Sequence, residues 1–333
     1  HCALHPHQLS GDKEGTFCSL ASFMKKAVIV QATGGELTNQ LWNYASVYAY
    51  CLERGYSLEN PSFFEYGNYF TIPAPNLFFK LFLFLPFTDY TKRKQSFKRR
   101  LWRRLYASYA RILILRHKDS VLVSDNKKNQ PFYLFPTEER TELLRLEKVA
   151  GTILFDGWLF RNPVGLQKYR REILQYFQPR RDIENAVKAR IRKLRGEFKH
   201  LAGVHIRQGD YLTWRDGVYF IAQTRVREIL DEYLQTTGRI VSETCFIITS
   251  DVPVDASLFA GLNIRVSKEN AVHDLFLLST TDTVIGANST FGAFASYLGN
   301  IPLIVMQKGH LDWEYYLDKK TYFENKYSTF VYY

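Results

Sequence analysis

Cysteine is scarce in this chain of 333 residues, with four present, at positions 2, 18, 51 and 245. No two of them form a Cys-x-x-Cys pair, and the histidines form no cluster at the spacing of metal ligands. The sequence therefore supports neither a disulfide framework nor a structural zinc site. A reducing compartment fits this pattern, and we expect a cytoplasmic location.

Two further features are missing. No apolar run reaches about 18 residues, so we expect no membrane-spanning helix. The chain also contains no Asp-x-Asp, the usual carboxylate pair for holding a nucleotide-sugar through Mg²⁺ or Mn²⁺. We therefore expect no metal and no other cofactor.

Acidic residues are absent from 92–118, which holds eleven Lys or Arg and leaves 33 basic against 33 acidic residues elsewhere. Apolar residues recur there at spacings of four or three, which predicts an amphipathic helix with a cationic face: Phe97, Leu101, Leu105, Tyr109 and Ile112. Three interpretations stay open: contact of residues 77–118 with an anionic membrane at the inner face of the plasma membrane, packing of the aromatic face on the core, or a nucleic-acid groove. We favour the membrane, and expect no nucleic-acid partner, because nothing else in the chain resembles a nucleic-acid module.

The chain divides into four parts by pattern. Residues 1–23 read as a leader or tag-like extension, 24–180 as an N-terminal domain with a basic and aromatic insertion at 77–118, 181–310 as a second domain, and 311–333 as a C-terminal segment. The first domain begins with a strand at 27–31, a glycine turn and a helix that stops at Gly55, and it later has a strand at 152–160 and a helix at 168–177. The second domain alternates regularly: strands at 200–206, 244–250, 263–267, 283–288 and 301–305, with helices at 182–195, 220–236, 272–280 and 290–298.

Strands that alternate with helices indicate a parallel sheet covered on both faces. Ligands of such sheets bind beyond the carboxyl ends of the strands. Polar clusters at 205–211, 249–251 and 288–290 follow three predicted strands, and we expect them to converge there.

Arg207 leaves the end of a predicted buried strand, and Gly209 allows the chain to turn after it. A planar guanidinium at that point suits a diphosphate, and its charge would stabilise the leaving group as a bond to phosphate oxygen breaks. Asp210 either orients Arg207 in a salt bridge or accepts a proton. His205 is either a site residue or a hydrogen-bonded core residue.

The segment His205-Ile206-Arg207-Gln208-Gly209-Asp210-Tyr211 resembles the His-x-Arg-Arg-Gly-Asp-Tyr motif of glycosyltransferase family 11, the α-1,2-fucosyltransferases. Other segments resemble that family in the same order: the turn at 35–40, Phe155 to Tyr169, the strand end at 246–251, and 273–279 through 287–291. Gln208 stands where the family has a second arginine, and Thr38 replaces a glycine of the turn.

The resemblance implies an α/β, GT-B-like fold of two facing Rossmann-like domains with parallel sheets, with 24–180 as the acceptor-side domain and 181–310 as the GDP-fucose-binding domain. It also implies metal-independent, inverting transfer of fucose from GDP-fucose to a galactose hydroxyl in α-1,2 linkage, in bacterial surface polysaccharide synthesis. The acceptor would be a galactose-containing glycan, including a lipid-linked one. The alternatives are a related GT-B transferase with another linkage or nucleotide-sugar, and a catalytically silent nucleotide- or glycan-binding protein.

The family's site residues carry over by position. Arg207 would bind the β-phosphate, His205 would shape the donor site, and Asp251 would lie near the guanosine. Ser289 and Thr290 would donate hydrogen bonds to phosphate at a helix N-terminus, and Asn39 would face the sugar or acceptor from the other domain. Proton removal would fall to Asp210 first and Glu36 second, or to the leaving phosphate itself.

Overall fold

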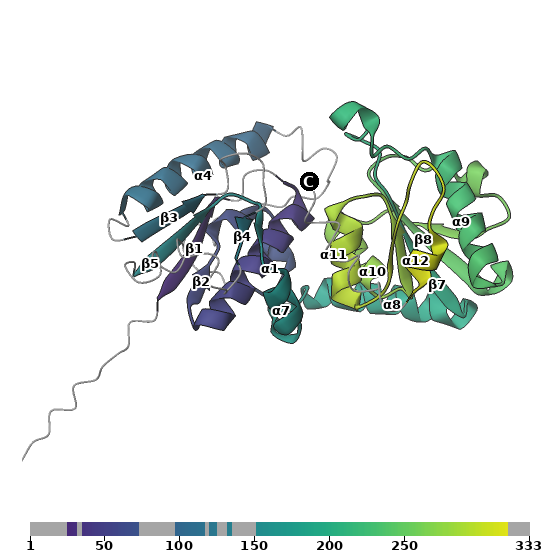
Figure 1. Cartoon of the computed structure of the whole chain (residues 1–333), viewed down its shortest axis with the longest axis horizontal. Coiled ribbons are helices and arrows are strands. Elements are labelled where there is room, and N and C mark those ends of the chain that lie inside the picture. The colour runs from purple at the N-terminus through teal and green to yellow at the C-terminus, as the bar shows by residue number, and fades with distance from the viewer. Residues whose placement is uncertain are drawn as a thin grey trace, which may run out of the picture.

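The computed structural model describes residues 25–31, 35–72, 97–116, 120–124, 132–134 and 151–318. They form two α/β domains that face each other, each built on a parallel sheet (Figure 1). This arrangement confirms the predicted fold class. Three predicted parts lie outside the described residues, namely the leader at 1–23, residues 77–96 and 117–118 of the basic insertion, and residues 319–333 of the C-terminal segment.

The first domain contains a four-stranded parallel sheet in the order β2-β1-β5-β3. Its strands are β1 (Lys26–Gln31), β2 (Ser57–Glu59), β3 (Ser120–Ser124) and β5 (Thr152–Asp156), and a separate pair joins β4 (Phe132–Tyr133) to β6 (Phe160–Arg161). The helices are α1 (Leu37–Arg54), α4 (Phe97–Arg116), α6 (Pro163–Lys168) and α7 (Arg170–Tyr176), with short 3-10 turns at Pro61–Glu65 and Gly67–Tyr69.

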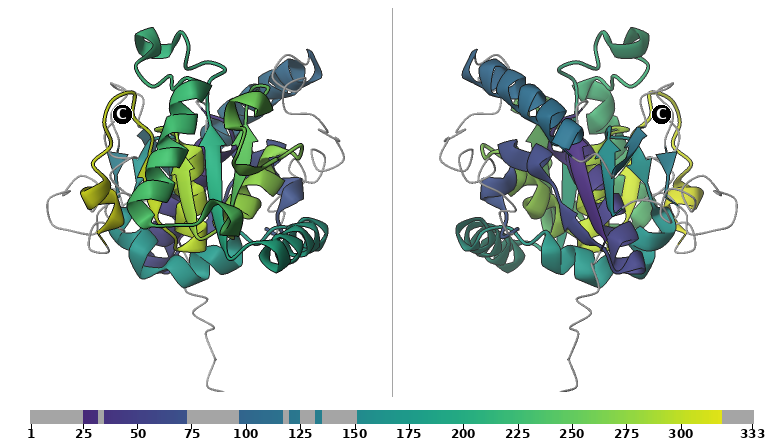
Figure 2. Two further views of the ribbon diagram at one scale, coloured as in Figure 1. Left: turned by 90° about the vertical axis from the view of Figure 1, so that its right-hand side faces the viewer. Right: turned by 90° about the vertical axis from the view of Figure 1, so that its left-hand side faces the viewer.

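Alternate residues of β1 serve opposite faces of this sheet, because side chains along a strand point to alternate sides. Ala27 and Ile29 join the cluster that contains α1, whereas Val28 and Val30 pack with Tyr106 of α4. The two helices therefore cover the two faces. Figure 2 (right) shows α4 lying across the outer side of the domain.

The second domain has five parallel strands in the order β11-β10-β7-β8-β9. They are β7 (His200–Ile206), β8 (Thr244–Ser250), β9 (Asn263–Val266), β10 (Thr283–Gly286) and β11 (Leu303–Val305). The helices are α8 (Arg181–Glu197), α9 (Gln223–Thr237), α10 (Ala271–Ser279), α11 (Thr290–Gly299) and α12 (Trp313–Leu317), with 3-10 turns at Trp214–Gly217, Val241–Glu243 and Ala256–Phe259. All seven residues of the central strand β7 are buried, as a sheet covered on both faces requires.

The predicted elements of the second domain are present within a few residues of their expected ends. The single strand expected at 152–160 is wrong, because β5 ends at Asp156 and β6 starts at Phe160. Gly157 separates them with a φ of 141°, a conformation that favours glycine and turns the chain.

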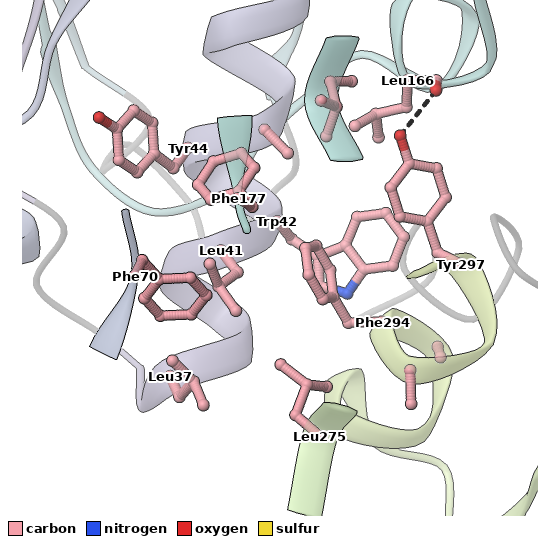
Figure 3. Packing of buried hydrophobic residues seen from close by; sticks show 14 of the residues in the cluster. Leu37, Leu41, Trp42, Tyr44, Phe70, Leu166, Phe177, Leu275, Phe294 and Tyr297 are labelled. Atoms are coloured by element: carbon pink, nitrogen blue, oxygen red, sulfur yellow. Dashed lines mark hydrogen bonds between the residues drawn. The ribbon is translucent and has the colours of Figure 1, made fainter. Parts of the chain in front are cut away.

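Aromatic side chains join the two domains. Trp42 of α1 packs edge-on against Phe294 of α11, with 4.8 Å between ring centroids, and also contacts Tyr297 (Figure 3). The Tyr297 hydroxyl donates to the Leu166 carbonyl oxygen at 2.8 Å. One hydrophobic cluster therefore continues from the first domain into the second, and it fixes α1 against α11.

In the part of the chain that the structure describes, no helix is long and apolar enough to cross a bilayer.

Candidate active site

Three strands of the second sheet end side by side. Register pairs Ile206 of β7 with Ser250 of β8, and His205 with Gly286 of β10. The residues that follow these positions therefore lie at one edge of the sheet. As the sequence predicts, the polar clusters after β7, β8 and β10 converge.

Arg207 is the first residue after β7, and two carboxylates surround its guanidinium. Its Nε lies 3.0 Å from Oδ1 of Asp210 and its Nη2 lies 2.9 Å from Oδ2, while Asp251 Oδ2 is 3.3 Å from Nε. The Arg207 side chain is 17% exposed and that of Asp210 is 53% exposed. The arginine is thus held in a fixed direction at the surface of the edge, with its more exposed partner on the outside.

The two hydrogen bonds between Arg207 and Asp210 are the geometry expected if the aspartate orients the arginine. The role of Asp210 in proton removal stays a prediction.

Asp251 shapes the loop that follows Arg207. Its Oδ1 accepts from the backbone N–H of Gln208 at 2.8 Å, and its Oδ2 accepts from the N–H of Gly209 at 3.2 Å. A Cβ at Gly209 would lie 2.8 Å from Asp251 Oδ2, so glycine permits this approach. Both carboxylate oxygens thus accept hydrogen bonds from the loop. The predicted position of Asp251 near the guanosine stays a prediction.

Gln208, which replaces the second motif arginine, is also held within the loop. Its Nε2 donates to the Ile221 carbonyl oxygen at 2.6 Å, and its Oε1 accepts from Gln223 Nε2 at 3.2 Å. Gln223 also donates to the Pro253 carbonyl oxygen at 2.9 Å. Gln223 therefore connects the loops after β7 and β8, a role that no motif in the sequence indicates.

His205 lies beneath the edge rather than on it. Its Nδ1 lies 3.2 Å from Thr249 Oγ1, and its ring stacks on Phe291 with 4.6 Å between centroids. Burial, together with the charge of Arg207, lowers the pKa of His205 to about 3. The imidazole is therefore uncharged near pH 7, and its predicted role in shaping the donor site stays a prediction.

The N-terminus of α11 brings Ser289 and Thr290 to the same edge. The Ser289 hydroxyl accepts from the backbone N–H of Phe291 at 3.3 Å and caps the helix. The Thr290 hydroxyl lies 2.9 Å from the Thr38 hydroxyl, and Trp42 Nε1 donates to the Thr290 carbonyl oxygen at 3.2 Å. The start of α1 therefore contacts the start of α11.

Asn39 follows Thr38 at this contact between the helices. Its Oδ1 is buried, with no hydrogen-bond partner among the residues that the structure describes. A Cβ at Gly35 would overlap Asn39, with Cβ atoms 2.2 Å apart, so the glycine of the turn makes room for the amide. The position suits a residue that faces the domain junction, and its predicted contact with the sugar or acceptor stays a prediction.

Glu36, at the N-terminus of α1, takes part in a network of charges. Its Oε2 accepts from the Tyr66 hydroxyl at 2.7 Å and from Arg99 Nη2 at 2.9 Å. Burial alone would raise the pKa of Glu36, but Arg99 and Tyr66 hold it below its usual value. The carboxylate is a weak base in this setting, and its predicted catalytic role has less support from the geometry than that of Asp210.

Asp274 is a polar residue of the second domain that the predicted site omitted. It lies in the first turn of α10, is 8% exposed, and accepts from the Ser267 hydroxyl at 2.5 Å. Burial raises the pKa of Asp274 to about 7, against the opposing effects of Ser267 and Arg190. The sequence signal was present, since this is the one acidic residue in a helix that is otherwise apolar except for His273 and Ser279.

Asp274 should make the free energy of unfolding depend on pH. Between about pH 4 and 7 the folded protein keeps this proton and the unfolded chain loses it, so stability falls as the pH rises and levels off above the folded pKa. Asp274→Asn keeps an acceptor for Ser267 and cannot ionise. The variant should gain on the order of 2–4 kcal/mol over the parent by pH 8 and little near pH 4, as measured by urea unfolding between these two pH values. A difference that does not change with pH would contradict this assignment.

Within the described ranges, no group of three or more His, Cys, Asp or Glu side chains is placed to hold a metal ion.

Residues 162–326, which include the whole second sheet and its carboxyl edge, match the family model of glycosyl transferase family 11. This match covers just under half of the chain, and it supports the resemblance of the chain to glycosyltransferase family 11. The protein is accordingly a transferase, and the resemblance noted for the segment at 205–211 is confirmed. The match begins at Asn162, so the turn at 35–40 lies outside it. No curated protein sequence matches the chain.

Solved structures of fucosyltransferases resemble this chain in fold over most of its length. NodZ from Bradyrhizobium has a TM-score of 0.50 and 16% identity, over 86% of this chain and 97% of that chain. POFUT1 in complex with GDP has a TM-score of 0.50 and 12% identity, over 85% of this chain and 99% of that chain. At these identities the likeness establishes the GT-B-like fold.

Proposed function

We propose that this protein transfers fucose from GDP-fucose to a galactose hydroxyl of a glycan, with inversion, in α-1,2 linkage and without a metal. The observation that carries the proposal is Arg207, held by Asp210 and Asp251 at the carboxyl edge of β7 within the family 11 residues. The cytoplasmic location and the role in bacterial surface polysaccharide synthesis belong to the same proposal.

The chemistry follows from charge. As the bond between fucose and the β-phosphate oxygen breaks, negative charge grows on GDP, and a fixed guanidinium stabilises it without reorganising. In the donor complex a phosphate would take the place of the exposed Asp210 carboxylate beside Arg207. The backbone N–H groups at the start of α11 offer a second source of positive potential.

The donor is supported by the structures of the same fold. A NodZ structure, described as an α-1,6-fucosyltransferase, was soaked with GDP-fucose, and the POFUT1 structure contains GDP. NodZ forms a linkage other than α-1,2, so the fold alone does not choose the hydroxyl. The α-1,2 linkage rests on the motif resemblance.

The proposal is tested with the purified chain, GDP-fucose, and a panel of galactosides and N-acetylglucosaminides, in the presence and absence of EDTA. We expect a fucosylated galactoside, equal yields with EDTA, and α-1,2 linkage on product analysis. Thermal unfolding should show stabilisation by GDP and little by UDP or ADP, because a ligand that binds only the folded state raises the midpoint.

The outcomes separate the alternatives. Stabilisation by UDP or ADP instead of GDP would assign a different nucleotide-sugar donor, and an α-1,6 product would assign a different linkage. GDP binding with neither transfer nor GDP release on the full panel would leave a silent nucleotide-binding protein and refute the proposed activity.

A further inference from the structure

Helix α4 has one face that the fold uses. Tyr106 and Ala110 are buried against the first sheet, and the Tyr106 hydroxyl donates to the Val30 carbonyl oxygen. Arg99, on the same side, is 4% exposed and donates to Glu65 at 2.8 Å. These contacts hold the helix on the domain without any help from its opposite face.

The opposite face of α4 carries a row of large apolar side chains, which we call the outer row. Its five members are between 44% and 74% exposed: Phe97, Leu101, Leu105, Ile112 and Leu115. Spacings of four, three and seven residues place them along one side of a helix. From first to last the row extends about 27 Å, at 1.5 Å per residue.

This orientation refines the prediction from sequence, which placed Tyr109 in the same stripe. Tyr109 is half-buried and packs with the inner cluster, together with Trp102. The side of the helix with Trp102, Tyr106 and Tyr109 therefore contacts the core, and the outer row faces outward. Monomeric proteins seldom expose a continuous apolar surface of this length without a partner.

Arginines border the outer row. Arg100, Arg104 and Arg111 are exposed and, at spacings of four and seven, run parallel to it along one edge. None of the three has a carboxylate within ion-pair distance among the residues that the structure describes. Helix α4 itself contains no Asp or Glu. The surface is thus apolar along its middle and cationic at its edge.

We propose that the outer row of α4 docks into the interface of an anionic lipid bilayer, with the bordering arginines at the headgroups. A bilayer satisfies both halves of this surface, because acyl chains accept the apolar row and anionic headgroups pair with the arginines. A second copy of the helix would bring arginines against arginines with no acid to pair them. Nucleic acid would pair the arginines and leave the apolar row in water.

The docked helix would begin beside the candidate active site. Arg99, in the first turn of α4, pairs with Glu36 at the start of α1, and Thr38 two residues later contacts Thr290. A membrane-bound enzyme would therefore present this edge near the lipid surface. The delivery of a lipid-linked acceptor rests on the proposed function, whereas docking itself does not.

Vesicle flotation of the full chain tests the docking. The parent should float with vesicles of phosphatidylcholine and phosphatidylglycerol at low salt and remain unbound with phosphatidylcholine alone. L101S/L105S/I112S and R100E/R104E/R111E should each reduce the bound fraction at limiting lipid by about tenfold or more. All six side chains are exposed, so thermal unfolding should stay within about 2 °C of the parent.

Matched control variants distinguish binding by this surface from an effect of net charge or of exposed hydrophobic area in general. K188E/R192E/K193E removes the same charge from the exposed side of α8, and V164S/V218S/I240S removes exposed apolar side chains elsewhere. Both should float as the parent does.

Failure of the parent to float at low salt, or equal loss of binding in the control variants, would overturn the proposal. Self-association of the parent that L101S/L105S/I112S abolishes would also overturn it, because the outer row would then bind a second copy. Displacement of the protein from vesicles by a short oligonucleotide at equimolar phosphate would overturn it as well. Fucosyl transfer to soluble galactosides should be unchanged in every one of these variants, so a failure here leaves the proposed activity intact.

Discussion

Arg207→Ala should lower the turnover of fucosyl transfer by about 100-fold or more, because the growing charge on GDP loses its fixed counter-charge. KM for GDP-fucose should change less than kcat if the arginine acts mainly in the transition state. The measurement is steady-state kinetics with a soluble galactoside. Arg207→Lys should recover only part of the loss, since an ammonium cannot reproduce the fork between two carboxylates.

The chain supplies a matched control for this arginine. Arg195 also forms a fork with one aspartate, with its Nη1 and Nη2 each 2.7 Å from an oxygen of Asp282. That pair lies at the opposite edge of the same sheet, where Asp282 also accepts from the N–H of Leu201 at the start of β7. Arg195→Ala should therefore reduce stability and leave turnover per folded molecule unchanged.

Normal transfer by Arg207→Ala would remove the assigned role from this residue. The same series resolves Asp210. If Asp210 only orients the arginine, Asp210→Asn should retain most of the turnover and an unchanged pH profile. If it removes the proton, the loss should rival that of Arg207→Ala and the acidic limb of the profile should disappear.

The sequence predicted the second domain well for a physical reason. Its central strands are buried on both faces and read as short apolar runs, and helices with an apolar side follow β7, β9, β10 and β11. The convergence of 205–211, 249–251 and 288–290 followed from the rule that parallel strands end at a common edge. No knowledge of side-chain contacts was needed for either step.

The side-chain contacts of the candidate site could not be predicted from the sequence. The spacing did not decide whether His205 is a site residue or a core residue. Only its ring stack on Phe291 and its hydrogen bond with Thr249 place it beneath the edge of the sheet. Glu36 was predicted as the second candidate for proton removal, but its partners Tyr66 and Arg99, 30 and 63 residues away along the chain, could not be predicted. Pairings at such separations leave no periodic signal.

The face of α4 shows the same limit. Periodicity predicted the helix and its cationic face. Apolar side chains occur on more than one side of this helix, however, so the pattern alone did not decide which side packs on the core. The hydrogen bond from Tyr106 and the ion pairs of Arg99 decide this. The exposed row follows from that choice.

Asp251→Ala should lower kcat/KM for GDP-fucose by about 100-fold, although the carboxylate need not touch the donor. Its loss removes the acceptor of the Gln208 and Gly209 N–H groups and one of the two partners of Arg207. The loop would then no longer hold the guanidinium in one direction, and misplacement of a catalytic group by about 1 Å can cost 10²-fold. The free energy of unfolding should fall by about 1–3 kcal/mol for the unpaired polar groups.

Asp282→Ala is the matched control for this loss, because Asp282 likewise accepts from an arginine and from a backbone N–H of the β7 region. Partial burial opposes its ionisation, but His200 and Arg195 hold the pKa of Asp282 well below its usual range. Its removal should therefore cost at least as much stability as that of Asp251 and leave kcat/KM of the folded fraction unchanged. If the two variants lost stability and activity in the same proportion, Asp251 would be a structural residue of the loop and nothing more. If Asp251→Ala lost activity alone, with the parent's unfolding midpoint, the aspartate would instead act on the donor directly, as its predicted place near the guanosine requires.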